Sequence, residues 1–143
     1  MKVSETAMAM VRQARVIAVV GLSSKPARAS YGVARYLQRQ GYRIVPVNPG
    51  EREVLGEPAY TDLDAAAAGV AGIEIVDVFR RSEHVPAVAE AAIRIGAKLL
   101  WLQEGVTHPE AEAAARAAGL EVVANRCLLK QHARLAVPAH REA

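Results

Sequence analysis

A polar, cationic loop follows the first apolar segment of the chain. Residues 16–20, Val-Ile-Ala-Val-Val, are mostly β-branched, which is typical of a strand buried on both faces of a parallel sheet. Gly21 ends this run, and the loop after it carries Ser23, Ser24, Lys25 and Arg28. A glycine lets the backbone turn tightly and approach a ligand, and the amide groups that open the following helix attract anions. The loop therefore predicts a phosphate-binding site.

The residue types in this loop suggest how a phosphate would be held. Ser23, Ser24 and the backbone amides would hydrogen-bond a pyrophosphate, while Lys25 and Arg28 would supply positive charge. The alternative is a loop with two solvated cations. The usual dinucleotide fingerprint needs further glycines just after Gly21, and this loop has serines and a proline there instead. The loop is therefore not an ordinary NAD signature.

The residues at the end of the second predicted strand also disfavour an NAD site. An NAD site places an Asp or Glu there to accept hydrogen bonds from the ribose hydroxyls. This chain has Asn48 and Pro49, followed by Arg52. A neutral amide with an arginine nearby tolerates a phosphorylated ribose, which a carboxylate would repel. The same residues also fit a plain surface turn, and the direction of Glu51 and Glu53 in this turn is open.

Apolar runs alternate with helical patterns along the whole chain. The predicted strands are 15–20, 43–47, 73–79, 98–102 and 120–124, and the predicted helices are 4–13, 30–40, a short helix after Asp62, 82–96, 109–118 and 128–135. This alternation predicts an α/β fold: a Rossmann-like, doubly wound, parallel five-stranded sheet with helices on both faces. The expected strand order is 3-2-1-4-5, with the ligand beside the ends of the first and fourth strands.

Composition limits the classes of function. The 143 residues fit one domain, residues 1–143 with a core of about 15–135. Scattered basic residues, a net charge of +3 and 4% aromatic residues disfavour a nucleic-acid surface. A single cysteine, Cys127, excludes an internal disulfide framework, and no run is long and apolar enough to span a membrane. We expect a cytoplasmic protein.

The remaining strand ends carry further candidates. Phe79 could lie against an adenine, and Arg80 or Arg81 could reach a phosphate or stack on the ring, although a core role is equally ordinary for the phenylalanine. Trp101 lies inside the fourth strand and is expected to be buried. Gly32, in the helix after the loop, is expected to allow close approach of helix and strand.

Taken together, the strand ends resemble a known family. The motifs are Gly21-Leu-Ser-Ser-Lys-Pro with Arg28, Ser30-Tyr-Gly-Val33, Pro46-Val-Asn-Pro49, Trp101-Leu-Gln-Glu-Gly-Val106 and Asn125-Arg-Cys127. Over residues 15–135 the chain resembles the small, single-domain CoA-binding proteins, whose fold is similar to the CoA-binding domain of the succinyl-CoA synthetase alpha subunit. The resemblance implies a fold that holds CoA or an acyl-CoA through its 3′-phospho-ADP part. It implies no reaction, because that enzyme carries its phosphorylated histidine in a further domain that this chain lacks.

Catalytic and metal-binding patterns are weak. The histidines, His84, His108, His132 and His140, share no metal-ligand spacing and are expected at the surface. Cys127 precedes a helix, which favours a reactive thiol, but a buried and inert cysteine is the preferred interpretation. Glu104 is a lone carboxylate beside a possible thioester. We expect a CoA-binding module that is non-catalytic alone and acts as a carrier, a sensor or a cofactor-presenting partner. The alternatives are an NAD(P)-dependent oxidoreductase, and a subunit of an acyl-CoA ligase or thioesterase.

Overall fold

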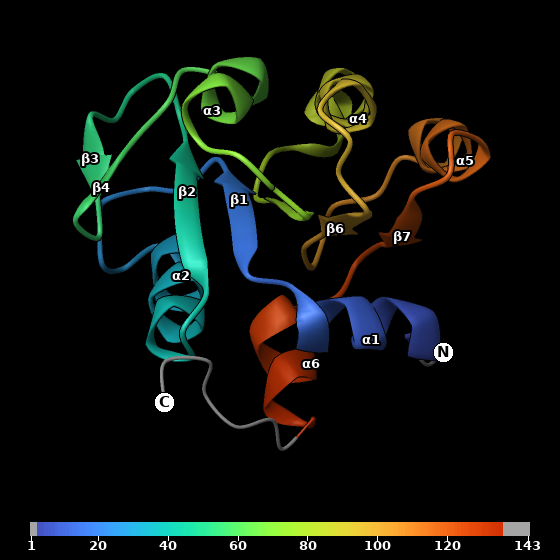
Figure 1. Ribbon diagram of the computed structural model, residues 1–143, viewed down its shortest axis with the longest axis horizontal. Coiled ribbons are helices and arrows are strands. Elements are labelled where there is room, and N and C mark those ends of the chain that lie inside the picture. Colours follow the sequence, from blue (N-terminus) through green and yellow to red (C-terminus); the bar gives the residue numbers. More distant parts are fainter. Residues whose placement is uncertain (1–2, 136–143) are drawn as a thin grey trace.

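Five parallel strands form the centre of the fold (Figure 1). The computed structural model describes residues 3–135. The sheet consists of β1 (Val16–Val20), β2 (Arg43–Val47), β5 (Ile75–Val78), β6 (Leu99–Leu102) and β7 (Glu121–Val123), and a separate hairpin of β3 (Glu53–Val54) and β4 (Glu57–Pro58) follows β2. The helices are α1 (Glu5–Gln13), α2 (Ala29–Arg39), α3 (Leu63–Gly69), α4 (Val85–Arg94), preceded by the 3₁₀ turn η1 (Ser82–His84), α5 (Pro109–Ala117) and α6 (Leu128–Ala133).

Polar side chains cap the amino ends of several of these helices. Ser4 accepts a hydrogen bond from the Ala7 amide at the start of α1, and Asp62 does the same for Ala65 at the start of α3. His108 caps α5, just before the proline that opens the helix. By contrast, α2 begins after Arg28, whose side chain makes no capping hydrogen bond. The amino end of α2 is therefore available to an external anion.

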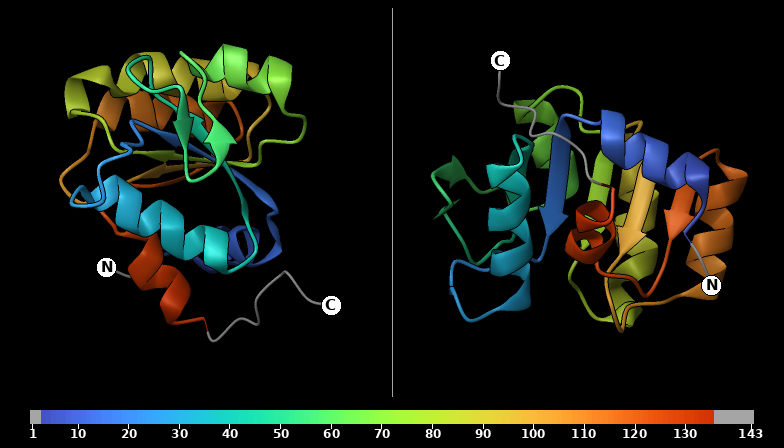
Figure 2. Two further views of the ribbon diagram at one scale, coloured as in Figure 1. Left: turned by 90° about the vertical axis from the view of Figure 1, so that its left-hand side faces the viewer. Right: turned by 90° about the horizontal axis from the view of Figure 1, so that it is seen from below.

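Helices cover both faces of the sheet. Figure 1 shows α3, α4 and α5 above the strands and α1, α2 and α6 below them, and the right panel of Figure 2 views the lower three from beneath. Alternate strand residues point to opposite layers: Ala18 and Val20 belong to the core under α3 to α5, whereas Ile17 and Val19 belong to the other core. The predicted α/β class, with a parallel sheet between two helical layers, is confirmed.

The order of the strands differs from the predicted one. The sheet runs β2-β1-β5-β6-β7, which is 2-1-3-4-5 when its strands are numbered along the chain, and not 3-2-1-4-5. The third strand lies beside the first, with Val20 paired to Val47 on one side and Val78 on the other. The connection from β2 crosses β1 before it enters β5, and a right-handed crossover in that direction places α3 on the face opposite α2. The reversal of strand order, where ligands bind in such sheets, therefore lies between β1 and β5 and not between the first and fourth strands.

The β3–β4 hairpin was not foreseen. Its two-residue turn places Leu55 and Gly56 at φ of 56° and 80°, which is the conformation of a tight hairpin turn. The leucine hides this signal, because leucine rarely adopts a positive φ. Gln38 of α2 donates a hydrogen bond to the Leu55 carbonyl at 2.9 Å and supports the turn from outside. The hairpin thus extends the segment that follows β2 along the side of α2.

Three smaller expectations are settled by burial. Trp101 is fully buried, as predicted. A Cβ at Gly32 would meet no atom within 4 Å, so the expected close approach at this glycine is wrong. His132 is buried, with 3% of its surface exposed, which contradicts the expectation of a surface histidine, while His140 lies outside the described residues. No helix within residues 3–135 is long and apolar enough to cross a membrane.

Candidate functional site

The loop after β1 begins at a point where two backbone segments nearly touch. Gly21 has a φ of +88°, and a Cβ there would lie 2.5 Å from the Phe79 carbonyl oxygen and 3.1 Å from the Arg80 side chain. Its amide donates to the Val47 carbonyl at 2.7 Å. The glycine is thus required by the close packing of the β1, β2 and β5 ends. Direct contact of Gly21 with a ligand stays a prediction.

Internal hydrogen bonds hold the rest of the loop in shape. The Ser23 amide donates to Oγ of the buried Ser30 at 3.0 Å, and the Lys25 amide donates to Ser23 Oγ at the same distance. The Arg28 amide then donates to the Lys25 carbonyl. The side chains of Ser23 and Ser30 therefore act first as parts of the scaffold. This leaves Ser24, which is exposed, as the serine that faces outward.

Ser24 already holds an anionic group. Its amide N–H and its hydroxyl both donate to Oε2 of Glu51, at 2.8 and 2.9 Å. Two donors from one residue that converge on one carboxylate oxygen form the arrangement that binds a phosphate oxygen. The sequence left the direction of Glu51 open, and the structure shows that its carboxylate points at the predicted phosphate loop.

Asn48 joins this loop to the end of β2. Its Nδ2 donates to the Leu22 carbonyl at 3.0 Å, and its Oδ1 accepts from the Gly50 amide at 2.9 Å. Both ends of the amide are therefore engaged within the protein. The side chain positions the two loops relative to each other, and its contact with a ligand remains a prediction.

A cavity of about 320 Å³ lies on the other side of the sheet edge, between α3 and α4. Its apolar lining includes Val20, Val47, Pro49, Leu63, Ala87, Val88 and Ala91, and its polar lining consists of Thr61, Asp62, Asp64, Arg80, His84 and Arg94. Six of the thirteen lining residues come from α3 and α4, and the rest come from strand ends and loops. The lining residues on α3 and α4 were missed from the sequence because the position of α3 depends on the strand order, whereas Pro49 and Arg80 had been predicted.

Charges at this cavity are partly paired. Arg94 donates two hydrogen bonds to Asp64, at 2.7 and 3.3 Å, and this contact holds the pKa of the Asp64 carboxyl below its ordinary value. Asp62 is engaged as the cap of α3. Within residues 3–135, Arg80 has no ion-pair partner, so its positive charge is available to a ligand in the cavity.

The predicted site residues therefore fall into two groups. Ser23, Ser24, Lys25 and Arg28 lie on the α2 side, where both cations are exposed and neither has an ion-pair partner in the described part of the chain. Pro49 and Arg80 line the cavity on the α3 side. Phe79 is half-buried and packs against the core between the sheet and the layer of α1, α2 and α6. Arg52 is exposed beside the hairpin, outside the cavity lining.

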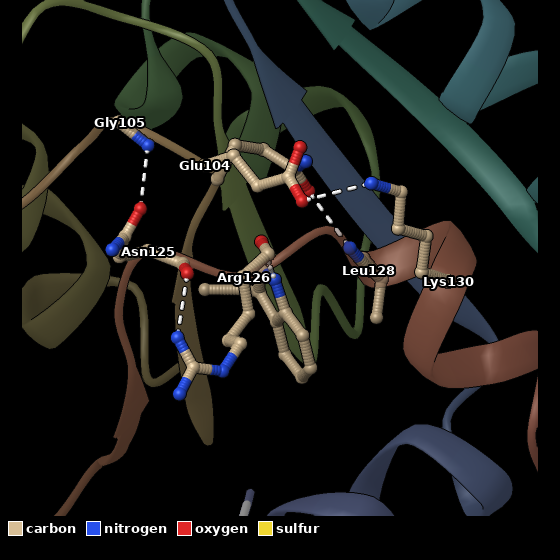
Figure 3. A network of polar contacts seen from close by, with 8 residues as sticks. Glu104, Gly105, Asn125, Arg126, Leu128 and Lys130 are labelled. Carbon is tan, nitrogen blue, oxygen red and sulfur yellow. Dashed lines mark hydrogen bonds and ion pairs between the residues drawn. The ribbon is translucent and has the colours of Figure 1, made fainter. Parts of the chain in front are cut away.

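The loops after β6 and β7 are bound to each other (Figure 3). Asn125, at a φ of +58°, accepts a hydrogen bond from the Gly105 amide at 2.7 Å, and Trp101 Nε1 donates to the Arg126 carbonyl at 2.9 Å. Gln103 is buried and accepts from the Leu128 amide at the start of α6. These contacts give the motifs of residues 101–106 and 125–127 a structural role, because they hold the ends of β6 and β7 together.

The two groups considered for chemistry are both constrained. Glu104 forms an exposed ion pair with Lys130 at 3.1 Å. Cys127 has 9% of its surface exposed and belongs to the core under α1, α2 and α6, so its predicted burial is confirmed. Sequence reasoning missed a third group, Asp77 of β5, which is fully buried and has no hydrogen-bond partner for either oxygen among the described residues. Its only signal was a charged residue in the middle of an apolar strand.

Comparisons with known proteins show what the whole chain is similar to. Residues 15–133 match the model of a family described as "CoA binding domain". An uncharacterized protein of Bacillus subtilis, YneT, is 39% identical over 124 residues, covering 87% of this chain and 90% of that protein. A solved structure of a hypothetical protein from Pyrococcus horikoshii is 39% identical with a TM-score of 0.84, covering 92% of this chain and 90% of that one. An acetyl-coenzyme A synthetase of Ca. Korarchaeum cryptofilum shares the fold at 21% identity and a TM-score of 0.67, over 81% of this chain and 26% of that protein.

Proposed function

The chain belongs to the CoA-binding domain family, and from this premise we propose that it binds coenzyme A or an acyl-CoA across the carboxyl edge of its sheet. The pyrophosphate would lie on the loop of residues 23–28, at the amino end of α2. One end of the ligand would enter the cavity between α3 and α4.

The contact between Ser24 and Glu51 is the observation that carries this proposal. The exposed amide and hydroxyl of Ser24 converge on one anionic oxygen, and a phosphate-binding loop holds a phosphate oxygen with donors arranged in the same way. Lys25 and Arg28 stand beside these donors without ion-pair partners in residues 3–135. The start of α2 adds its helix dipole, and no side chain of the N-cap residue Arg28 occupies its first amides.

The cavity helps to assign the ends of the ligand. Its volume of about 320 Å³ lies at the lower limit of ligand sites, which span roughly 300–1,000 Å³, so it accommodates only part of CoA. Its apolar lining suits a base, and Arg80 supplies a cation for a phosphate on the attached ribose. We therefore assign the adenosine 3′-phosphate end to the cavity. Arg80 is favoured over Arg52 for the 3′-phosphate, because Arg52 lies outside the cavity lining.

We further propose that binding is the whole activity of the isolated chain, as a carrier, a sensor or a cofactor-presenting partner. Support comes from the two groups that were weighed as possible reactive groups, since Cys127 is buried and Glu104 is paired with Lys130. The free cysteine also fits a reducing compartment, so we place this role in the cytoplasm.

Calorimetry with four ligands tests the proposal. CoA should bind in the micromolar range, and NAD and NADP at least about tenfold more weakly, a gap of about 1.4 kcal/mol. Dephospho-CoA should bind less well than CoA, and Arg80→Ala should remove that difference while the matched variant Arg52→Ala preserves it. Tighter binding of NAD than of CoA would overturn the assignment. Mass spectrometry of the gently purified protein would identify any acyl group directly.

A further inference from the structure

Glu51 occupies the position that the proposed function assigns to a ligand phosphate. We propose that its carboxylate is an internal anion: it holds the Ser24 donors in the unliganded protein and is displaced when a phosphate group of CoA binds. This inference rests on the proposed phosphate site, and it makes Glu51 a residue that sets the affinity of that site.

The displacement is required because the donors cannot serve two anions. Oε2 of Glu51 takes both the amide N–H and the hydroxyl of Ser24. A phosphate on the same donors would lie next to the carboxylate, where two like charges repel each other even in water. One anion must therefore leave before the other binds.

The loop keeps its shape when Glu51 leaves. Ser23 is fixed by its bonds to Ser30 and Lys25, and the Arg28 amide is fixed by the Lys25 carbonyl. None of these contacts involves Glu51. The cradle is therefore formed before the ligand arrives, and the carboxylate only blocks it.

Glu51 can leave through side-chain rotation alone. Its amide donates to the Asn48 carbonyl at 3.1 Å, and Asn48 is in turn tied to the Leu22 carbonyl, so the backbone of this turn is anchored. The side chain is half-exposed and has three rotatable bonds. A rotation moves the carboxylate into solvent, where hydration replaces the bonds to Ser24.

The test compares Glu51→Gln and Glu51→Ala with the wild type and with Glu53→Gln. Glu53 is an exposed carboxylate two residues further along, so this control removes the same charge without touching the Ser24 contact. Two probes are used, CoA by calorimetry and inorganic pyrophosphate by the chemical shift of the Ser24 amide. Both Glu51 variants should bind both probes about 3- to 10-fold more tightly than the wild type, and the control should match the wild type within about twofold.

The two probes separate this inference from the CoA assignment. If no variant binds CoA but pyrophosphate binds more tightly to the Glu51 variants, the CoA function fails and the internal anion stands. Equal or weaker pyrophosphate binding by the Glu51 variants overturns the internal anion, because Glu51 then supports the bound state or plays no part. An equal gain in the Glu53 control also overturns it, since general charge then explains the effect.

Discussion

Asp77 should make the protein less stable as the pH rises. This carboxyl lies in the central strand β5, between Val19 of β1 and Trp101 of β6, with none of its surface exposed. Neither oxygen has a hydrogen-bond partner among the described residues. Burial therefore raises the pKa of Asp77 well above its usual range, because the charged form loses hydration and gains nothing in return.

The sign of the effect follows from proton linkage. The folded state keeps the Asp77 proton at pH values where the unfolded chain releases it. The stability contributed by the protonated group is thus complete below pH of about 3.9, the ordinary value for Asp, and is lost as the pH rises toward the folded pKa. The loss is about 1.4 kcal/mol for each pH unit in this window. Two measurements made two units apart inside it should therefore differ by about 2.7 kcal/mol.

Asp77→Asn isolates this term, because it is nearly isosteric and cannot ionise. Urea unfolding of the wild type and the variant, at pH values from about 5 to 8, gives the difference in free energy of unfolding at each pH. Other titrating groups cancel in that difference. The advantage of the variant should grow with pH at the stated slope and level off above the folded pKa. A constant offset carries no weight, since Asn and protonated Asp both bury polar atoms without a partner.

Asp64→Asn provides the control, because the pKa of Asp64 is shifted in the opposite direction from that of Asp77. Asp64 is exposed, and its contact with Arg94 lowers its pKa, so its contribution is present above the unfolded pKa and disappears only as the pH falls through the folded value. Between pH 5 and 8 its effect should be flat. If the effect of Asp77→Asn is flat as well, the buried carboxyl has a partner or a water, and the reasoning is refuted.

Three further predictions address the loop and the thiol. Replacing Lys25 and Arg28 together by Ala should weaken CoA binding at least about tenfold, as measured by calorimetry. The melting temperature should stay nearly unchanged, because exposed loop cations contribute little stability. Unchanged CoA affinity would show that both side chains are only solvated cations. Gly21→Ala should lower the free energy of unfolding by at least about 2 kcal/mol, since the new Cβ meets the Phe79 carbonyl at a positive φ, and wild-type stability in urea would contradict this. Because Cys127 is buried, oxidised CoA should not add to its thiol in the folded protein. Intact-mass spectrometry should therefore show the CoA adduct only after unfolding. An adduct on the folded protein that Cys127→Ser abolishes would refute the burial argument.

The candidate site was only partly readable from the sequence. The loop of residues 21–28 was found because glycine, serine and cationic residues after an apolar strand have a local meaning. The contact of Ser24 with Glu51 was not found, since it joins residues 27 positions apart through the packing of two strand ends. Asn48 was predicted to bind the ligand at the end of β2, and the structure shows that its amide holds the Leu22 carbonyl and the Gly50 amide, while its ligand contact stays a prediction.

By itself the sequence determined the layered α/β fold and the edge of the sheet at which the candidate site is proposed. Apolar β-branched runs make buried parallel strands, helices between them force crossovers, and the carboxyl ends of such strands meet at one edge whatever their order. Only the tertiary structure decided that β5 lies beside β1, that α3 faces away from α2, and that Asp77 is sealed between Val19 and Trp101. Periodicity along a chain shows which residues are buried. It does not show which strand becomes the neighbour, because that choice is made by side-chain packing between segments distant in sequence.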